Sequence, residues 1–414
     1  MHDFDALYSQ NTHNMKKSII RELLKLTNKP GLISFAGGLP APETFPVEEL
    51  RIAADAVFTK SPEIGLQYGT TEGDPSLKAE IIKIEAEDGV KIGMDNLIVT
   101  SASQQALDIL PKIFLDPGDW IIAGHPTYLG AIQAVQSYRG NILGIPFAQA
   151  EDGFDLEELE KRYAAHRTAG KSIKYIYVIP DFQNPTGICW SLEKRKALLR
   201  FAYRENLIVV EDAPYREIRL VGSPLPSLYQ LDQEMENRNT VVGLRTFSKI
   251  LAPGARMGWI IGHPDLIAKF VVAKQAMDLC TNVFTQRWLA EFLATGKLRE
   301  VIEKTKANYR GKREFMLEQL ELHMPKHPGL KWTKPEGGLF LWISLPKSID
   351  ADEMFHKAIA KNVAYVVGSA FYFDNPEHNS MRLNFSFSSH AEIEEGVKRL
   401  AEVVRNEIAA KEGR

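Results

Sequence analysis

Short apolar runs alternate with segments of helical spacing over most of the chain. Because these runs are almost uniformly apolar, they are typical of strands that are buried on both faces of a parallel sheet. The alternation with helices therefore predicts an α/β fold with a mostly parallel sheet covered by helices on both sides. The predicted strands are 97–100, 120–123, 175–179, 207–210, 240–244 and 258–262. Among the intervening helices, the clearest is Leu192–Leu199, with Ser191 as its N-cap.

The pattern changes towards both ends of the chain. Residues 18–26 have apolar positions at helical spacing, and Pro30-Gly31 ends this amphipathic segment. After about residue 295 a long charged helical pattern precedes three further strands and a C-terminal helix that starts near Ala391. Those three strands are predicted at 338–343, 363–367 and 381–385. We therefore predict an N-terminal arm with a capping helix (1–45), a large domain (46–295) and a smaller α+β domain (296–414).

Charge and composition exclude several classes of protein. Lys plus Arg is 50 and Asp plus Glu is 53, so the formal net charge of −3 argues against a nucleic-acid groove or a polybasic membrane anchor. The two cysteines, Cys189 and Cys280, form neither a disulfide framework nor a CxxC pattern, and no metal site is expected. The N-terminus lacks the order of a signal peptide, and no apolar run approaches the ~20 residues of a membrane span. A cytoplasmic location is therefore expected.

Polar residues follow four of the predicted strands. They are the run 101–105, Asn184, Asp212 and Lys249. Each alone has an ordinary explanation: Ser101 or Ser103 as a helix cap, Asn184 in a turn, Asp212 in an ion pair, Lys249 on the surface. In an open α/β sheet, however, ligands bind at the carboxyl ends of the strands. Four such ends together indicate a binding site.

Four motifs resemble those of class I/II aminotransferases over nearly the whole chain. They are Asn184-Pro185-Thr186-Gly187, Asp212-Ala213-Pro214-Tyr215, Thr246-Phe247-Ser248-Lys249 and Gly254-Ala255-Arg256-Met257-Gly258. The segments 18–27 and 35–42 are similar to the 2-aminoadipate and kynurenine aminotransferase branch. This resemblance implies fold type I, with a seven-stranded sheet in the large domain, pyridoxal 5′-phosphate as cofactor, and a homodimer with shared active sites.

The resemblance also implies the catalytic residues. Lys249 would hold the cofactor as a Schiff base and, once freed, move a proton from Cα of the substrate in a ping-pong reaction. Asp212 would keep the pyridine nitrogen protonated, which makes the ring a better electron sink. Tyr215 and Asn184 would hydrogen-bond the phenolic oxygen of the ring.

The remaining cofactor contacts follow from the same resemblance. Tyr128 would stack on the pyridine face, and Tyr68 would reach the phosphate of the neighbouring subunit. The phosphate would be bound at the start of the helix after Ser101, because the backbone N–H groups there attract anions. The side chains expected around it are Ser103, Gln104, Thr246, Ser248 and Arg256.

Substrate recognition is expected to depend on two arginines. Arg382 matches the arginine that binds the α-carboxylate bidentately, a geometry that suits a planar guanidinium. Gly38 and Asn184 would add contacts to the same group. Arg21 would meet a distal carboxylate, so 2-aminoadipate and glutamate join aromatic and aliphatic amino acids as expected donors. A 2-oxo acid such as 2-oxoglutarate would be the acceptor.

Two other functions are compatible with the same motifs. A PLP-dependent lyase, decarboxylase or racemase would need the same lysine and aspartate, because only the orientation of the Cα bonds distinguishes these reactions. A transcription regulator with an aminotransferase-like domain is disfavoured, because only a short arm precedes the motifs and the charge is not basic.

Overall fold

A seven-stranded sheet forms the centre of the molecule in this computed structural model, which describes residues 3–15 and 30–413. Its strand order is β2-β8-β7-β6-β5-β3-β4, and β8 alone runs antiparallel to its neighbours. The strands are Leu97–Thr100 (β2), Trp120–Gly124 (β3), Asn141–Ile145 (β4), Ile173–Val178 (β5), Ile208–Asp212 (β6), Val241–Thr246 (β7) and Gly258–Ile261 (β8). The predicted mostly parallel sheet of an α/β protein is therefore confirmed.

Helices pack around this sheet, as the apolar strands require. Those between or beside the strands are α5 (Pro75–Glu87), α6 (Ala102–Phe114), α7 (Leu129–Ser137), α8 (Leu156–Thr168), α9 (Leu192–Glu205), α10 (Leu228–Glu234) and α11 (Pro264–Asp278). The predicted cap of α9 is present, since the Ser191 hydroxyl accepts a hydrogen bond from the Lys194 N–H. None of the helices in residues 3–15 and 30–413 combines the length and apolar character needed to cross a bilayer.

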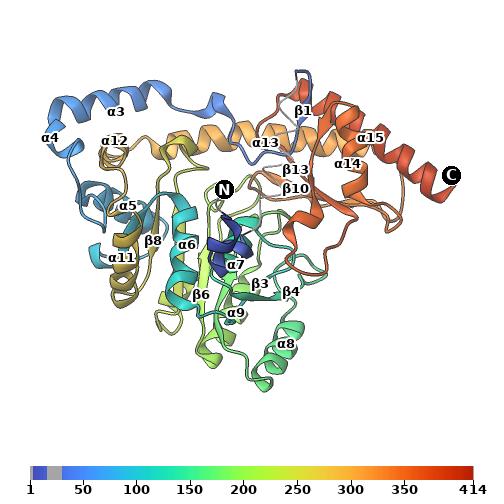
Figure 1. The fold of residues 1–414 in the computed structure, drawn as a ribbon. Helices are drawn as coiled ribbons and strands as arrows, with labels where there is room; N and C mark the ends of the chain where they lie inside the picture. The colour runs from blue at the N-terminus through green and yellow to red at the C-terminus, as the bar shows by residue number, and fades with distance from the viewer. Residues whose placement is uncertain (1–2, 16–29, 414) are drawn as a thin grey trace.

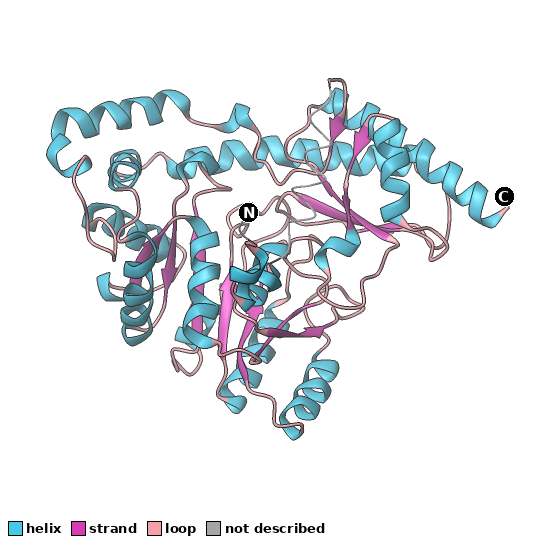
Figure 2. Ribbon diagram, in the orientation of Figure 1, coloured by secondary structure: helices cyan, strands magenta, loops and turns pink. Residues whose placement is uncertain are grey.

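A smaller antiparallel sheet lies apart from the large one, at the upper right of Figure 2. It consists, in spatial order, of Val366–Val367 (β12), Ser380–Asn384 (β13), Phe340–Ser344 (β10) and Lys331–Trp332 (β9). The helices α14 (Ala351–Ala360) and α15 (His390–Glu412) belong to this end of the molecule. The strand β1 (Ile33–Ser34) pairs with β11 (Val363–Ala364), so this part of the N-terminal arm packs with the C-terminal part of the chain.

Long helices connect the two ends of the molecule. Figure 1 shows α3 (Val47–Lys60) and α13 (Leu298–His323) along one side, with α13 extending towards α15. The remaining helices are α1 (Gln10–Asn14), α4 (Pro62–Gly65) and α12 (Val283–Leu293). Single-turn 3-10 helices occur at Asp5–Leu7, Pro42–Thr44, Met94–Asn96, Pro253–Ala255 and Gly368–Phe371. The boundary expected near residue 295 falls between α12 and α13, and the division into three parts stays a prediction.

The predicted strands differ from those of the structure at three places. The edge strand β4 was not predicted. The strand expected at 338–343 begins at Phe340, because Gly338 has a positive φ of 70° that a strand does not accept. The strand expected at 363–367 divides at Tyr365, since β11 pairs with β1 and β12 pairs with β13. The amphipathic helix expected within 18–26 lies outside the described residues.

Candidate active site

A cavity of about 660 Å³ lies at the carboxyl edge of the large sheet, where β5, β6 and β7 end. Because parallel strands end at the same edge, side chains that are far apart in the sequence meet there. Most of the predicted site residues line this cavity: Gly38, Ser103, Gln104, Tyr128, Asn184, Asp212, Tyr215, Thr246, Ser248, Lys249, Arg256 and Arg382. Tyr68 does not line it, and Arg21 lies outside the described residues.

Lys249 follows β7 and extends into the cavity. Its Nζ donates a hydrogen bond of 2.8 Å to the carbonyl oxygen of Gly38. Burial lowers the pKa of Lys249 to about 8, and the positive charges of Arg382 and Arg256 contribute to this lowering. The unprotonated amine, which a nucleophile or a base requires, is therefore available at a lower pH than for an exposed lysine.

Asp212, the last residue of β6, is held by a tyrosine on the neighbouring strand. The Tyr177 hydroxyl donates a hydrogen bond of 2.7 Å to Asp212 Oδ2. Burial raises the pKa of Asp212 to about 6, whereas this hydrogen bond and the charge of Arg245 lower it. The other oxygen, Oδ1, is buried and accepts no hydrogen bond from the described residues. A protonated ring nitrogen would satisfy it.

The start of α6 has the features of an anion site. Ala102 has a positive φ of 59°, and the Ser101 side chain makes no cap hydrogen bond, so Ser101 does not act as the ordinary cap that its position suggested. Ser103 Oγ is buried without a partner among the described residues. The Cβ of any residue other than glycine at 258 would lie 2.9 Å from the Ala102 carbonyl carbon, so Gly258 allows this close approach.

The other residues predicted at the phosphate lie on the loop after β7. Thr246 Oγ1 lies within hydrogen-bond distance of Ser248 Oγ, at 2.8 Å, and of the Met257 carbonyl oxygen, at 3.1 Å. Arg256 is exposed and has a left-handed backbone, with φ 49°. Hydroxyl groups, backbone N–H groups and a guanidinium are the donors that a phosphate dianion requires.

Tyr128 forms one wall of the cavity and packs on Gly130. A Cβ at position 130 would lie 2.5 Å from Cε1 of the Tyr128 ring. Glycine at this position therefore allows the ring to lie against the start of α7. Tyr215 is buried just beyond the end of β6, and burial raises the pKa of its hydroxyl, which stays protonated as a hydrogen-bond donor.

Arg382 on β13 is the cation on the small-sheet side of the cavity, with only 3% of its surface exposed. Its Nη1 donates to Asn184 Oδ1 at 2.7 Å and its Nη2 donates to the Ala36 carbonyl at 2.9 Å. The guanidinium carbon lies 4.0 Å from the ring centroid of Phe340 and 5.0 Å from that of Phe371. These rings hold the guanidinium by cation–π contact and leave its edge for a ligand.

No acidic partner of Arg382 occurs among the described residues, and its Nε is buried without a hydrogen-bond partner. Burial lowers the pKa of Arg382 to about 10. Buried charges in proteins are normally paired, so this guanidinium is suited to an anionic ligand.

Two residues of the site were not predicted from the sequence. Tyr177 orients Asp212, and Phe340 packs on Arg382 while its ring meets that of Tyr215 edge-on at 5.8 Å. Both lie within apolar strands, where an aromatic residue is ordinarily read as core. For Tyr177 the sequence does contain one indication: a tyrosine within a buried strand needs a polar partner for its hydroxyl, and Asp212 on a nearby strand is such a partner.

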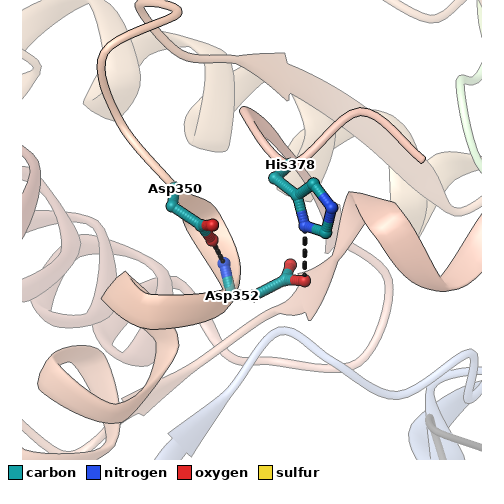
Figure 3. A group of neighbouring side chains, drawn as sticks. All are labelled: Asp350, Asp352 and His378. Atoms are coloured by element: carbon teal, nitrogen blue, oxygen red, sulfur yellow. Dashed lines mark hydrogen bonds and ion pairs between the residues drawn. The ribbon is translucent and has the colours of Figure 1, made fainter. Parts of the chain in front are cut away.

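A separate group, Asp350, Asp352 and His378, has the composition of a metal site (Figure 3). Its atoms have other partners, however. Asp350 Oδ1 accepts a hydrogen bond from the Asp352 N–H at 2.8 Å and caps α14. The Asp352 carboxylate accepts from His378 Nδ1 at 2.9 Å and from Ser369 Oγ at 2.8 Å. We therefore assign this group to the capping of α14.

Comparisons with known proteins agree with this arrangement. The family model "Aminotransferase class I and II" matches residues 39–400. The chain is 43% identical to aromatic-amino-acid aminotransferase 1 of Thermococcus litoralis, over 98% of this chain and 96% of that protein.

Two solved structures are similar over almost their whole length. One is a kynurenine aminotransferase of Pyrococcus horikoshii in complex with PMP (TM-score 0.92, 43% identity, 98% of each chain). The other is an α-aminoadipate aminotransferase of Thermus thermophilus in complex with N-(5′-phosphopyridoxyl)-L-leucine (TM-score 0.90, 36% identity, 99% of this chain and 100% of that one).

Proposed function

Because the chain belongs to the class I and II aminotransferases, a family of PLP-dependent enzymes of fold type I, we propose that it transfers the amino group of an aromatic amino acid or of 2-aminoadipate to a 2-oxo acid. Glutamate and aliphatic amino acids are further donors, and 2-oxoglutarate is the proposed acceptor. The names of the similar proteins support the aromatic and 2-aminoadipate donors.

One observation carries the proposal: Arg382, a buried guanidinium without an acidic partner among the described residues, lines the same cavity as Lys249. Every amino acid and every 2-oxo acid has an α-carboxylate, so one bidentate site serves both half-reactions. The amine of Lys249 is then near the carbon whose proton must be moved. The Gly38 carbonyl, which accepts a hydrogen bond from Nζ, offers the freed amine a fixed acceptor.

Each residue of the cavity is proposed to have its own role in the reaction. Pyridoxal phosphate supplies, when bound, an aldehyde that captures the amino group and a ring that takes up the electron pair released at Cα. Asp212, oriented by Tyr177, would hold a proton on the ring nitrogen. Lys249 Nζ would take up the proton of the substrate Cα and later return a proton. Asn184 and Tyr215 would donate hydrogen bonds to the phenolic oxygen, and Tyr128 would cover the ring face.

The side-chain specificity is proposed to depend on Arg21. We expect Arg21→Ala to lower kcat/KM for 2-aminoadipate by roughly tenfold, because a charge-assisted contact to its distal carboxylate is lost. The value for phenylalanine should stay within about twofold. Steady-state rates across aromatic, aliphatic and acidic donors with 2-oxoglutarate measure this. Arg204→Ala, at a half-exposed arginine on α9, is the matched control. An equal loss for all donors would contradict the selective role.

A PLP-dependent lyase or decarboxylase is the alternative reaction on the same residues. The same incubations distinguish it, because transamination produces glutamate in proportion to the donor consumed. Release of ammonia or carbon dioxide without glutamate would favour the alternative.

A homodimer with shared sites is proposed from the position of Tyr68. Its side chain is 79% exposed and lines a hollow between α4 and α12 that is separate from the main cavity. Other large apolar side chains of this part of the chain are also exposed, including Phe58, Ile64 and Leu66. A second copy would cover this surface and bring Tyr68 to the neighbouring phosphate.

We expect Tyr68→Phe to weaken cofactor binding by roughly tenfold, since one hydrogen bond to a charged phosphate is lost. Equilibrium dialysis with PLP measures the affinity, and analytical ultracentrifugation checks that the variant keeps the assembly of the native protein. Unchanged affinity in an intact dimer, or a native protein that is monomeric and active, would count against the shared site.

A further inference from the structure

Directly behind Asp212, on the reverse face of the large sheet, lies a buried ion pair that the reaction does not use. Glu211 precedes Asp212 in β6 and is fully buried, and Arg245 on β7 is 5% exposed. Arg245 Nη2 lies 2.8 Å from Glu211 Oε2, and Nη1 donates to the Leu244 carbonyl at 3.2 Å. Glu211 Oε1 accepts from the Leu228 N–H at 2.6 Å.

Successive side chains of a strand point to opposite faces, so Glu211 and Asp212 are two adjacent buried acids on the two faces of one strand. Only one of them faces the cofactor cavity. Neighbouring strands are about 5 Å apart, which places the Arg245 backbone one strand away from both acids. Two carboxylates this close in a dry interior do not both stay ionised unless each has a cationic partner.

We propose that Arg245 is a positioning residue of the cofactor site: by neutralising Glu211 from behind the sheet, it leaves Asp212 free to stay ionised and to hold the proton of the ring nitrogen. The inference rests on the proposed role of Asp212. In this arrangement Arg245 is the ion-pair partner of Glu211, and the protonated ring would be that of Asp212. Arg195 also acts electrostatically on Glu211, but its Nη2 is paired with Asp181 at 2.7 Å. Without Arg245, the charge of Glu211 would therefore act on Asp212 without a direct ion-pair partner of its own.

The charges around Asp212 agree with this arrangement. After burial, which raises the pKa of Asp212, the hydrogen bond from Tyr177 and the charge of Arg245 lower it, and Glu211 raises it. Glu85 is a third buried acid on this face: burial raises its pKa, Trp259 Nε1 donates to its Oε1 at 2.8 Å, and Arg245 Nε lies 3.7 Å from the same oxygen.

The test uses the holoenzyme loaded with PLP that is ¹⁵N-labelled at the ring nitrogen, whose NMR shift reports whether this nitrogen carries a proton. We expect a protonated ring in the native protein and in Arg245→Lys. Arg245→Met should move the signal towards the unprotonated form and lower kcat by roughly tenfold, the change that accompanies one pKa unit. Arg245→Met/Glu211→Gln, which removes both charges, should restore the protonated signal.

A merely structural Arg245 would give a different set of results. An unchanged ring signal in Arg245→Met, or a double variant as altered as the single one, would overturn the proposal. Where Arg245→Met does not fold, Arg245→Gln, which keeps a polar side chain but removes the charge, is measured instead, and an unchanged ring signal in that variant overturns the proposal. Asp212→Asn is measured in parallel, because an unaffected ring in that variant would contradict the role of Asp212 itself.

Discussion

Replacing Lys249 by alanine is expected to lower kcat for transamination by about 10⁴-fold, because general acid–base catalysis alone contributes up to that factor and the covalent attachment is lost as well. Borohydride reduction should then no longer fix the cofactor to the protein. The proposed phosphate donors at the start of α6 are unchanged, so the variant should still bind PLP noncovalently. Mass spectrometry after reduction and steady-state kinetics measure the two effects.

Lys249→Arg is the matched control for this change. It keeps a positive charge beside Arg382 and Arg256 but has no amine that can condense with an aldehyde. Both variants should therefore be inactive, whereas a small amine added to the solution should restore part of the activity only in the alanine variant, which leaves room for it. Fixation of PLP in either variant would show that another lysine carries the cofactor and would contradict the assignment.

The pH dependence of cofactor capture follows from the same amine. Its pKa is lowered to about 8, and the neutral form, which attacks the aldehyde, predominates above that value. The rate at which cofactor-free protein captures PLP should therefore rise with pH up to about 8 and then level off.

The strand ends of the large sheet could be predicted from the sequence because they depend on simple patterns. Uniformly apolar runs mark strands buried on both faces, and polar residues directly after them must meet at one edge. This placed Asn184, Asp212 and Lys249 in one cavity, where the structure also has them. The edge strand β4, Asn141–Ile145, was not predicted, although its run is as long as those of the predicted strands and, like the run 240–244, contains a single glycine.

The residues that orient the site could not be predicted in the same way. Tyr177 and Phe340 lie inside apolar strands, and only the tertiary structure shows that one meets Asp212 and the other meets Arg382. The pairing of Arg245 with Glu211 depends on strand order, which brings β6 beside β7. Likewise, the division of the predicted strand at Tyr365 depends on two different partner strands. Sequence patterns report burial, whereas these contacts depend on which strands are neighbours.

Arg382→Leu is expected to lower kcat/KM for every amino acid by about 10²- to 10³-fold, because an ionised carboxylate would enter a buried site without its guanidinium. Arg382→Lys should recover only part of this loss, since an ammonium cannot form two parallel hydrogen bonds and loses the contact with the Phe340 ring. Cofactor affinity should change little in either variant, because Arg382 is not among the proposed phosphate donors. Kinetics with several donors and dialysis with PLP measure these quantities.

The Arg382 variants also test whether substrate binding changes the pKa of Lys249. The charge of Arg382 helps to lower the pKa of Lys249, so its removal should raise that pKa and move the pH profile of PLP capture above 8. Arg382→Lys keeps the positive charge and should keep the native pH profile of PLP capture. Because the α-carboxylate brings a negative charge to Arg382, substrate binding itself should make Lys249 more basic at the stage when it must take the proton from Cα. An Arg382→Leu protein with a native pH profile and less than about tenfold loss of kcat/KM would contradict both the carboxylate site and this electrostatic link.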